Sequence, residues 1–220
     1  QFLGRCYSLG NKAYEEEKSA KKEIIEINKK IYEKDKSILE IYQKGKDWSL
    51  EYFEKIYKRL GTKFAFYYFE SESGEVGLNL VKEYEKKGIF EKSDGAVIFP
   101  GEKYGLHNRV FINSQGFPTY EAKDLGLPPT KHKNFPYDRS IIITGNEINE
   151  YFKVVLAALS KIYPDLASKT IHISHVMVRL SGGKISSRLG NIIGGESLLD
   201  EVKLKIRKNF KEMDDDTAEK

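Results

Sequence analysis

The sequence predicts an α/β fold that contains a parallel, doubly wound sheet. Two apolar segments that suit buried strands, 140–144 and 170–178, are separated by an amphipathic helix pattern at 146–163. A glycine-containing loop at 182–191 and a helix from Ser197 follow the second strand. Strand, helix, strand, loop and helix in this order are typical of parallel sheets, in which ligands bind at the carboxyl ends of the strands.

The first 62 residues are expected to form a helical region. In 5–43, apolar residues from Ala20 to Ile41 recur three and four residues apart, with Lys34 as the one polar interruption, which predicts one long helix. Gly45 is expected to end this helix, and the apolar positions between Leu50 and Leu60 predict a second one. The two helices would form a hairpin, which could be an RNA-facing appendage or a plain packing element.

Residues 63–138 are expected to connect the helical region to the parallel sheet. The expected elements are an aromatic-rich strand at 63–69, a helix at 75–87, a short strand at 95–99 and a β-hairpin with arms at 109–113 and 117–120. A helix that begins near Thr119 is expected to break before Pro128 and Pro129, because proline lacks the backbone N–H that a helix needs.

Composition limits the class of protein. Hydrophobic residues make up 40% and aromatic residues 12% of the 220 residues, which indicates a globular chain. No apolar stretch approaches the roughly 20 residues of a membrane span. Cys6 is the one cysteine, which excludes an internal disulfide and a cysteine-cluster metal site and suits the reducing cytoplasm. We expect no protein-bound metal, no membrane association and a monomer.

The net charge of +4 is unevenly distributed. Residues 161–211 contain ten Lys or Arg against four Asp or Glu, whereas 214–216 are three consecutive aspartates. A basic segment around a glycine-containing loop suits a polyanionic ligand. The cations at 203–211 would equally suit the solvated face of a helix.

The loop at 182–191 combines glycines, cations and hydroxyls at a strand-to-helix junction. Glycines let the backbone approach a phosphate, Ser186 and Ser187 can donate hydrogen bonds, and Lys184 and Arg188 can neutralise charge. A surface turn with two cations would have the same composition, so the loop alone leaves both interpretations open. No Gly-x-Gly-x-x-Gly or P-loop pattern occurs, which disfavours an ordinary dinucleotide enzyme or P-loop ATPase.

Several motifs together resemble one family. Residues 184–191, Lys-Ile-Ser-Ser-Arg-Leu-Gly-Asn, resemble the Lys-Met-Ser-Lys-Ser loop of class I aminoacyl-tRNA synthetases, and more closely its arginyl variant, Lys-Met-Ser-Thr/Ser-Arg-x-Gly-Asn. Residues 117–125 are similar to the Tyr-x-x-x-Asp-Leu/Ile segment of arginyl-tRNA synthetases, and 145–153 to the helix that follows their next strand. The resemblance extends from about residue 5 to 211.

The resemblance implies a domain organisation. Residues 139–211 would form the second half of a Rossmann-type, HUP-like nucleotide-binding domain, so that the chain holds half of a doubly wound parallel sheet. Residues 1–62 would be a helical insertion, 63–138 a connecting α+β region with a hairpin, and 212–220 a frayed acidic tail.

The resemblance also implies an activity. Family members activate L-arginine with ATP, accompanied by Mg²⁺, to arginyl-adenylate, and then esterify tRNA(Arg) for protein synthesis. The chain is therefore expected to belong to an arginine–tRNA ligase whose partners are tRNA(Arg), L-arginine and ATP.

Candidate site residues are carried over position by position. The arginine-binding candidates are Tyr120, Asp124, Glu147 and Asn149; the ATP-binding candidates are Met177, Val178, Lys184 and Ser187; and the catalytic candidates are Lys184, Ser186 and Arg188. Physical chemistry supports the first group, because Tyr120 and Asp124 are four residues apart and share one face of a helix. A carboxylate such as Asp124 can accept two parallel N–H bonds from a guanidinium, although a surface carboxylate paired with a lysine is the alternative.

Some positions depart from the family pattern. Where the family commonly has Glu-Gln-x-x-His-Phe, this chain has Ile148 in place of the glutamine and Tyr151 in place of the histidine, and Val176 replaces a common glycine. Ile148 cannot hydrogen-bond a substrate, so Glu147 or Asn149 would take over.

A His-x-Gly-His motif, which grips ATP in the first half of the family's catalytic domain, does not occur in the 220 residues. We therefore expect that the isolated chain does not aminoacylate. One alternative is a non-catalytic RNA-binding relative of the synthetases. Another is a helical interaction module, based on the repeated apolar positions of 20–60.

Overall fold

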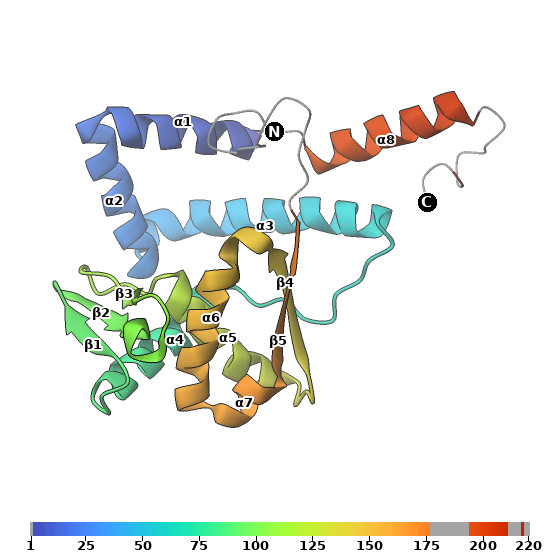
Figure 1. Cartoon of the computed structure of the whole chain (residues 1–220). Helices are drawn as coiled ribbons and strands as arrows, with labels where there is room; N and C mark the ends of the chain where they lie inside the picture. Colours follow the sequence, from blue (N-terminus) through green and yellow to red (C-terminus); the bar gives the residue numbers. More distant parts are fainter. Residues whose placement is uncertain (1, 177–193, 211–216, 218–220) are drawn as a thin grey trace. The chain divides into compact units, whose positions relative to one another are not determined.

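The computed structural model of the chain describes residues 2–176, 194–210 and 217 (Figure 1). These residues fall into two compact units, one made of Gln1–Ala65 with Arg179–Lys220 and the other of Phe66–Val178. None of the helices in the described ranges combines the length and hydrophobicity that a bilayer span requires.

The first unit is helical. It contains α1 (Phe2–Glu16), α2 (Lys18–Tyr32), α3 (Lys36–Arg59) and α8 (Gly195–Asn209). The guanidinium of Arg59 in α3 lies 2.8 Å from the carboxylate of Asp200 in α8. The predicted helical character of this region is confirmed.

The predicted positions of the helix breaks are wrong. The helical segment is interrupted at Glu17 and again at 33–35, whereas α3 continues through Gly45. Lys34 has a left-handed backbone, φ 55°, and the Asp35 carboxylate caps α3 by accepting from the Ser37 amide at 2.8 Å. Gly45 has no such backbone conformation, so flanking residues with good helix propensity carry α3 across it.

The second unit begins with an extended segment instead of the predicted strand at 63–69. This segment has no strand partner among the described residues. The Phe66 ring packs against Phe135, with ring centroids 6.1 Å apart. Aromatic packing therefore replaces strand pairing, and α4 (Glu70–Glu85) follows directly.

A three-stranded antiparallel sheet follows α4. Its strands are β1 (Glu91–Ser93), β2 (Ala96–Phe99) and β3 (Arg109–Ile112) in that order, with the short 3₁₀ helix η1 (Gly101–Tyr104) between the last two. The predicted strand at 95–99 is confirmed.

The predicted hairpin between 109–113 and 117–120 is present in a short form, with an antiparallel bridge between Ile112 and Pro118. The Asn113 amide donates to the Phe117 carbonyl and the Thr119 amide to the Phe111 carbonyl, both at 3.0 Å. The strand β3 also pairs with β2. The tight turn itself is present, because the Asn113 side chain accepts from the amides of Gln115 and Phe117 at 3.0 Å.

Helix α5 (Tyr120–Asn134) does not break at Pro128 and Pro129 as predicted. Pro128 is buried, and Gly126 lies against the backbone of α4, where an added Cβ would be 2.1 Å from the Ser73 carbonyl oxygen. Close packing of α5 on α4 thus outweighs the two hydrogen bonds that the prolines remove.

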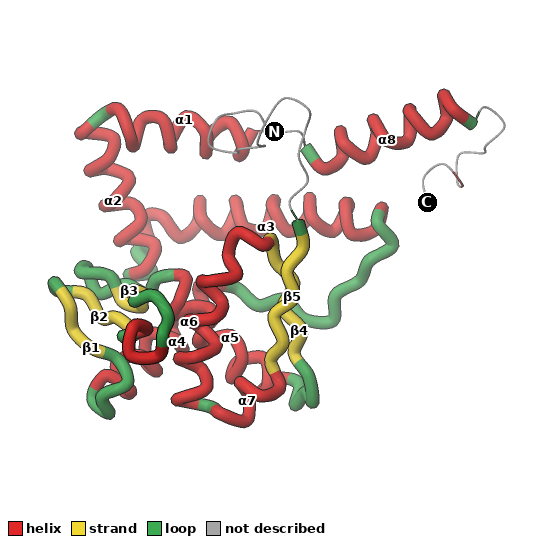
Figure 2. Tube along the Cα trace, viewed as in Figure 1, coloured by secondary structure: helices red, strands yellow, loops and turns green. Residues whose placement is uncertain are grey.

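The predicted parallel strand pair is confirmed. β4 (Ser140–Gly145) and β5 (Thr170–His175) pair in parallel, so that Gly145 and His175 lie opposite each other at the carboxyl ends. The connection runs through the 3₁₀ helix η2 (Asn146–Ile148), helix α6 (Asn149–Ile162) and the short helix α7 (Pro164–Lys169), as Figure 2 shows.

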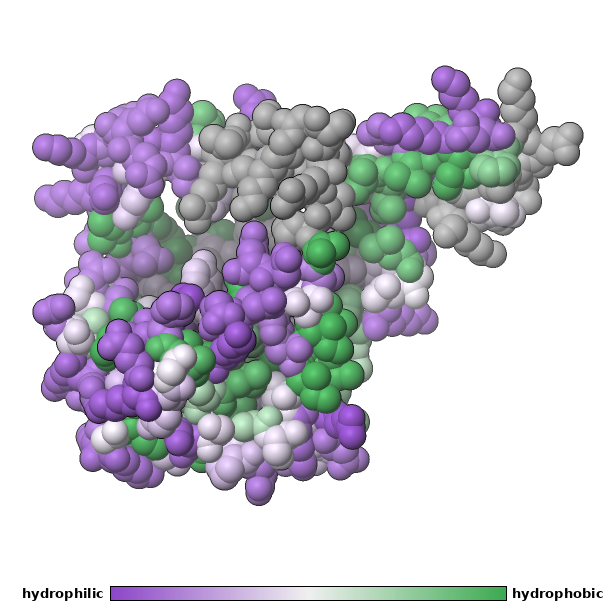
Figure 3. All heavy atoms as spheres, viewed as in Figure 1, coloured by the Kyte–Doolittle hydropathy of each residue, from purple (hydrophilic) through white to green (hydrophobic). Residues whose placement is uncertain are grey.

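The two strands are not buried on both faces as predicted. His172 packs on Phe152 of α6 with ring centroids 4.2 Å apart and hydrogen-bonds the Thr144 hydroxyl at 2.7 Å. The opposite face exposes Ile141 and Ile143, which are 55% and 67% exposed. Hydrophobic surface is visible over these strands in Figure 3. Within the described residues, helix α6 therefore covers one face of the sheet.

The core of the second unit joins the antiparallel sheet to α5 and α6. Phe90, Phe99 and Phe111 form an aromatic cluster, in which the Phe90 and Phe111 ring centroids are 5.0 Å apart. Leu125 of α5 and Leu159 of α6 are completely buried in the same cluster. This shared core fixes α5 and α6 to each other, and both helices carry predicted site residues.

Candidate functional site

Asp124 and Tyr151 form the centre of the candidate site. Asp124 lies in the second turn of α5 and Tyr151 in the first turn of α6, and the two helices are in contact. The Tyr151 hydroxyl donates a hydrogen bond of 2.5 Å to Asp124 Oδ2. Since α6 begins just after β4, this pair follows the carboxyl end of a parallel strand, where ligands of such sheets bind.

The environment of Asp124 disfavours its charge. Burial is the largest effect that raises the pKa of the Asp124 carboxyl, and the nearby carboxylates of Glu70 and Glu121 raise it further. The Tyr151 hydrogen bond and the Lys123 ammonium act in the opposite direction. A neutral side chain at this position would make the folded chain more stable. A carboxylate that is present despite this cost is therefore a candidate functional group.

Tyr151 is protonated throughout the physiological pH range. Burial raises the pKa of the Tyr151 hydroxyl, and the negative charge of Asp124 raises it further. Tyr151 is therefore a permanent hydrogen-bond donor to Asp124.

Arg109 and Glu121 border this pair. The Arg109 guanidinium lies over the Tyr151 ring, 5.5 Å from the centroid, and is 3.4 Å from the Glu121 carboxylate. Glu121 is buried, whereas the Lys123 ammonium pairs with Glu70 at 2.8 Å. When Asp124 is ionised, the carboxylates of Glu70, Glu121 and Asp124 outnumber the cations of Lys123 and Arg109, which pair with Glu70 and Glu121. The excess negative charge suits one further cationic ligand.

Tyr120 and Asp124 both lie in α5, four residues apart, as the predicted helix requires. Tyr120 is the first residue of α5 and is 67% exposed. The Lys123 ammonium lies over its ring, 4.9 Å from the centroid. Its hydroxyl makes no hydrogen bond to any residue that the structure describes.

Asn149 and Glu147 lie where β4 leads into α6. Asn149 is the first residue of α6, and its side-chain oxygen is buried without a hydrogen-bond donor among the described residues. A buried acceptor without a partner costs about 1–3 kcal/mol, so this amide oxygen suits a ligand that brings an N–H group. Glu147 is exposed in η2.

The remaining predicted residues lie outside the described residues: Met177, Val178, Lys184, Ser186, Ser187 and Arg188. The description of β5 ends just before them, at the sheet edge where Gly145 pairs with His175. The ATP-binding and catalytic assignments therefore stay predictions.

Three residues around Asp124 were missed by sequence reasoning. Tyr151 stands where the family pattern has histidine, and this position carried a signal, since both residues can donate a hydrogen bond. Arg109 and Glu121 belong to different elements and follow no periodicity, so their proximity arises from the packing of α5 against β3.

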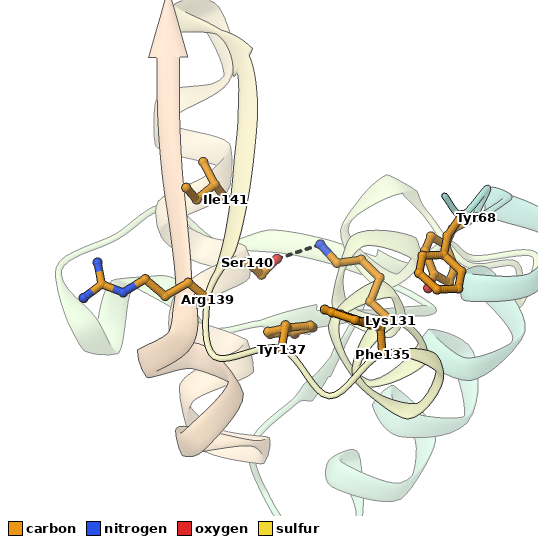
Figure 4. A pocket seen from close by; sticks show the side chains of 8 residues that line it. Tyr68, Lys131, Phe135, Tyr137, Arg139, Ser140 and Ile141 are labelled. Carbon is orange, nitrogen blue, oxygen red and sulfur yellow. Dashed lines mark hydrogen bonds between the residues drawn. The ribbon is translucent and has the colours of Figure 1, made fainter. Parts of the chain in front are cut away.

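A pocket lies near the beginning of β4, at the opposite end of the strand from α6 (Figure 4). It has a volume of about 250 Å³. Lys131 donates to the Ser140 hydroxyl at 2.6 Å, and burial lowers the pKa of the Lys131 ammonium. The Arg139 side chain extends away from the rings of the pocket, among them those of Tyr68 and Phe135. None of the predicted site residues lines this pocket.

The chain is similar in sequence to arginine–tRNA ligases. The family model described as tRNA synthetases class I (R), catalytic domain, matches residues 1–220. The chain is 33% identical to the arginine–tRNA ligase of Borrelia garinii subsp. bavariensis over 209 residues, and 34% identical to that of Borreliella afzelii over 206 residues. These alignments cover 91% and 90% of this chain but 36% and 35% of the relatives. The chain thus spans about a third of their length.

Solved structures agree on the fold. The arginyl-tRNA synthetase of Plasmodium falciparum has a TM-score of 0.69 at 16% identity, covering 87% of this chain and 32% of that one. The arginyl-tRNA synthetase of Thermus thermophilus has a TM-score of 0.54 at 16% identity, covering 97% of this chain and 47% of that one. At such identities the likeness concerns the fold alone.

Proposed function

Because the chain belongs to the class I arginyl-tRNA synthetase family, we propose that it carries the arginine-binding part of an arginine–tRNA ligase. Such an enzyme activates L-arginine with ATP to arginyl-adenylate and transfers the arginine to tRNA(Arg). The observation that carries this proposal is the match of the catalytic-domain family over all 220 residues. The relatives' names supply the reaction, and their greater length makes the whole reaction a proposal for this chain.

Arginine recognition would depend on Asp124. Its carboxylate can accept two parallel N–H bonds from the guanidinium, which a lysine ammonium cannot match in geometry. The buried oxygen of Asn149 can accept a further N–H, and this supports its role in place of the glutamine that Ile148 replaces. Tyr120 and Glu147 would contact the substrate from exposed positions at the helix starts.

ATP would bind at the carboxyl end of β5. Backbone groups of Met177 and Val178 would meet the adenine, and Lys184, Ser186, Ser187 and Arg188 would hold the triphosphate while the arginine carboxylate attacks the α-phosphate. Mg²⁺ would arrive with ATP, because it is a hard cation that binds phosphate oxygens. The ion would neutralise phosphate charge.

The basic character of 161–211 supports an interaction with the tRNA backbone. The single cysteine, Cys6, is exposed and unpaired, which supports a reducing cytoplasmic setting. We propose that the protein is a monomer.

A non-catalytic RNA-binding relative is the second candidate. One sequence observation favours it, namely Ile148 at a position where the family commonly has a glutamine. This candidate predicts RNA binding without selective arginine binding.

Arginine binding to the 220-residue chain tests the proposal. In an NMR titration with ¹⁵N-labelled chain, L-arginine is expected to shift amide signals of α5 and of the beginning of α6. Lysine and citrulline should bind at least about tenfold more weakly, because lysine lacks the planar, forked guanidinium and citrulline lacks its positive charge. Equal shifts with all three ligands would contradict an arginine site. The chain is expected to show no arginine-dependent ATP–pyrophosphate exchange by itself.

Lys184→Ala should slow adenylate formation by about 10²–10³-fold in a protein of the family's full length that contains this chain. The reason is the loss of a cation at the triphosphate in the transition state. Arginine-dependent ATP–pyrophosphate exchange measures it, with Lys92→Ala of β1 as the matched control, because the Lys92 side chain is 79% exposed and lies outside the basic segment. An unchanged exchange rate in Lys184→Ala would remove this lysine from the site.

A further inference from the structure

Tyr151 contributes the hydrogen-bond donor that faces the candidate arginine ligand Asp124. Its hydroxyl lies 2.5 Å from Asp124 Oδ2, and it is the one hydrogen-bond donor to this carboxylate among the residues that the structure describes. We propose that Tyr151 is a positioning residue that orients the Asp124 carboxylate and favours its ionised form, so that a guanidinium meets an anion. This inference rests on the proposed arginine site.

The charges around Asp124 show why it needs a donor. From α4, the Glu70 carboxylate faces it, and from α5 the Glu121 carboxylate does so too. Opposing them are the Lys123 ammonium of α5, which is itself paired with Glu70, and the Tyr151 hydroxyl of α6. Burial and two carboxylates thus favour a proton on Asp124, and the Tyr151 hydrogen bond is the largest effect that favours the ionised form.

From β3, the Arg109 guanidinium completes the surroundings. It stacks on the Tyr151 ring and pairs with Glu121, so its charge is partly compensated. This stacking depends on the ring and not on the hydroxyl. Tyr151→Phe therefore keeps the packing of Arg109 and removes the hydrogen bond alone.

The protonation state of Asp124 decides what it can bind. A guanidinium is always charged and carries N–H donors but no acceptor. An ionised carboxylate offers two acceptor oxygens to it, whereas a protonated carboxyl presents an O–H donor on one of them. Without the Tyr151 hydroxyl, the protonated form would persist to higher pH and compete with arginine.

The titration of the Asp124 carboxyl in the ligand-free chain tests the inference directly. With ¹³C-labelled aspartate, and with Asp124→Asn to assign the signal, the half-titration point in Tyr151→Phe should lie about one pH unit above that of the wild type. Tyr163→Phe is the matched control, because Tyr163 caps the other end of α6 and its hydroxyl has no hydrogen-bond partner among the described residues. An unchanged Asp124 titration in Tyr151→Phe would overturn the proposal.

Arginine affinity as a function of pH provides the functional test. In Tyr151→Phe, the loss of affinity on acidification should begin about one pH unit higher, whereas the affinities at high pH should agree within about threefold. In the Asp124→Asn background, Tyr151→Phe should have no further effect. A loss of the same size at every pH would indicate a merely structural role and would overturn the inference.

The two proposals can fail separately. If the wild-type chain binds no arginine at any pH, while Tyr151→Phe still moves the Asp124 titration, the arginine site is refuted and the control of Asp124 by Tyr151 stands. If arginine binds selectively and the titration does not move, the positioning role alone is refuted.

Discussion

Asp124→Asn is expected to abolish selective arginine binding and, at neutral pH, to stabilise the chain. The variant keeps the shape of the side chain and an oxygen for the Tyr151 hydroxyl, but it removes the charge that pairs with the guanidinium. Loss of one partner from a partly buried charge-assisted pair costs about 2–4 kcal/mol, which corresponds to a loss of affinity of roughly 30- to 1000-fold.

The stability gain follows from the direction of the Asp124 pKa shift. Burial raises the pKa of this carboxyl in the folded chain above its ordinary value of 3.8. Between these two pKa values, the folded state holds a proton that the unfolded state has lost. The free energy of unfolding therefore falls as the pH rises through this window, and the loss is complete above the folded-state pKa.

Asparagine does not ionise and avoids this loss. A higher free energy of unfolding and a higher melting temperature than those of the wild type are therefore expected at pH 7. The gain should shrink toward pH 4. A carboxylate that lowers stability and is nevertheless present fits a role in binding.

Thermal unfolding monitored by circular dichroism at pH 4, 5.5 and 7 measures the effect, alongside the arginine titration. Asp138→Asn is the matched control, because Asp138 is exposed in the segment before β4. It should change neither stability nor arginine affinity. If Asp124→Asn bound arginine as tightly as the wild type, the guanidinium role of Asp124 would be wrong.

Much of the parallel strand pair was predictable from local sequence. Residues 141–143 are three consecutive isoleucines, isoleucines stand at 171 and 173, and the helix between the strands carries apolar residues at helical spacing. Such periodicity reports which residues prefer to be buried in a strand or helix. It does not report which elements exist to cover each face, and the exposure of Ile141 and Ile143 was therefore missed.

The candidate site was predicted only in part, because sequence patterns do not report how α5 packs against α6. Asp124 and Asn149 were identified through the resemblance, and the structure gives each an environment that suits a ligand. The Tyr151 hydrogen bond joins residues 27 positions apart, and it depends on how α5 packs against α6. Tyr120, by contrast, obeys the helical spacing and still points its ring toward Lys123.

The packing of α5 depends on glycines whose function no sequence pattern revealed. Gly77 of α4 lies against α5 so closely that an added Cβ would be 1.7 Å from the Ala122 carbonyl oxygen and 2.6 Å from its carbon. Gly126 of α5 lies correspondingly close to Gly77 and Ser73. These contacts involve backbone atoms, which cannot rotate away. They also explain why α5 stays helical across Pro128 and Pro129 in this position.

Gly77→Ala is therefore expected to destabilise the unit formed by 66–178 by at least about 2–3 kcal/mol. To admit the methyl group, α5 must move away from α4, and Asp124 lies half a turn beyond Ala122 on α5. The displacement should weaken the hydrogen bond from Tyr151, so that arginine binding falls together with stability. Urea unfolding followed by far-ultraviolet circular dichroism measures the first effect, and the arginine titration measures the second.

Gly74→Ala is the matched control, one turn earlier on the same helix. There the added Cβ would lie 3.2 Å from Cγ of Lys123, a flexible side chain that can move, and alanine favours the helix by about 0.5–1 kcal/mol over glycine. We expect Gly74→Ala to change stability by less than about 0.5 kcal/mol and to leave arginine binding intact. Equal effects of the two substitutions would show that α4 and α5 tolerate separation, and that close backbone packing does not position Asp124.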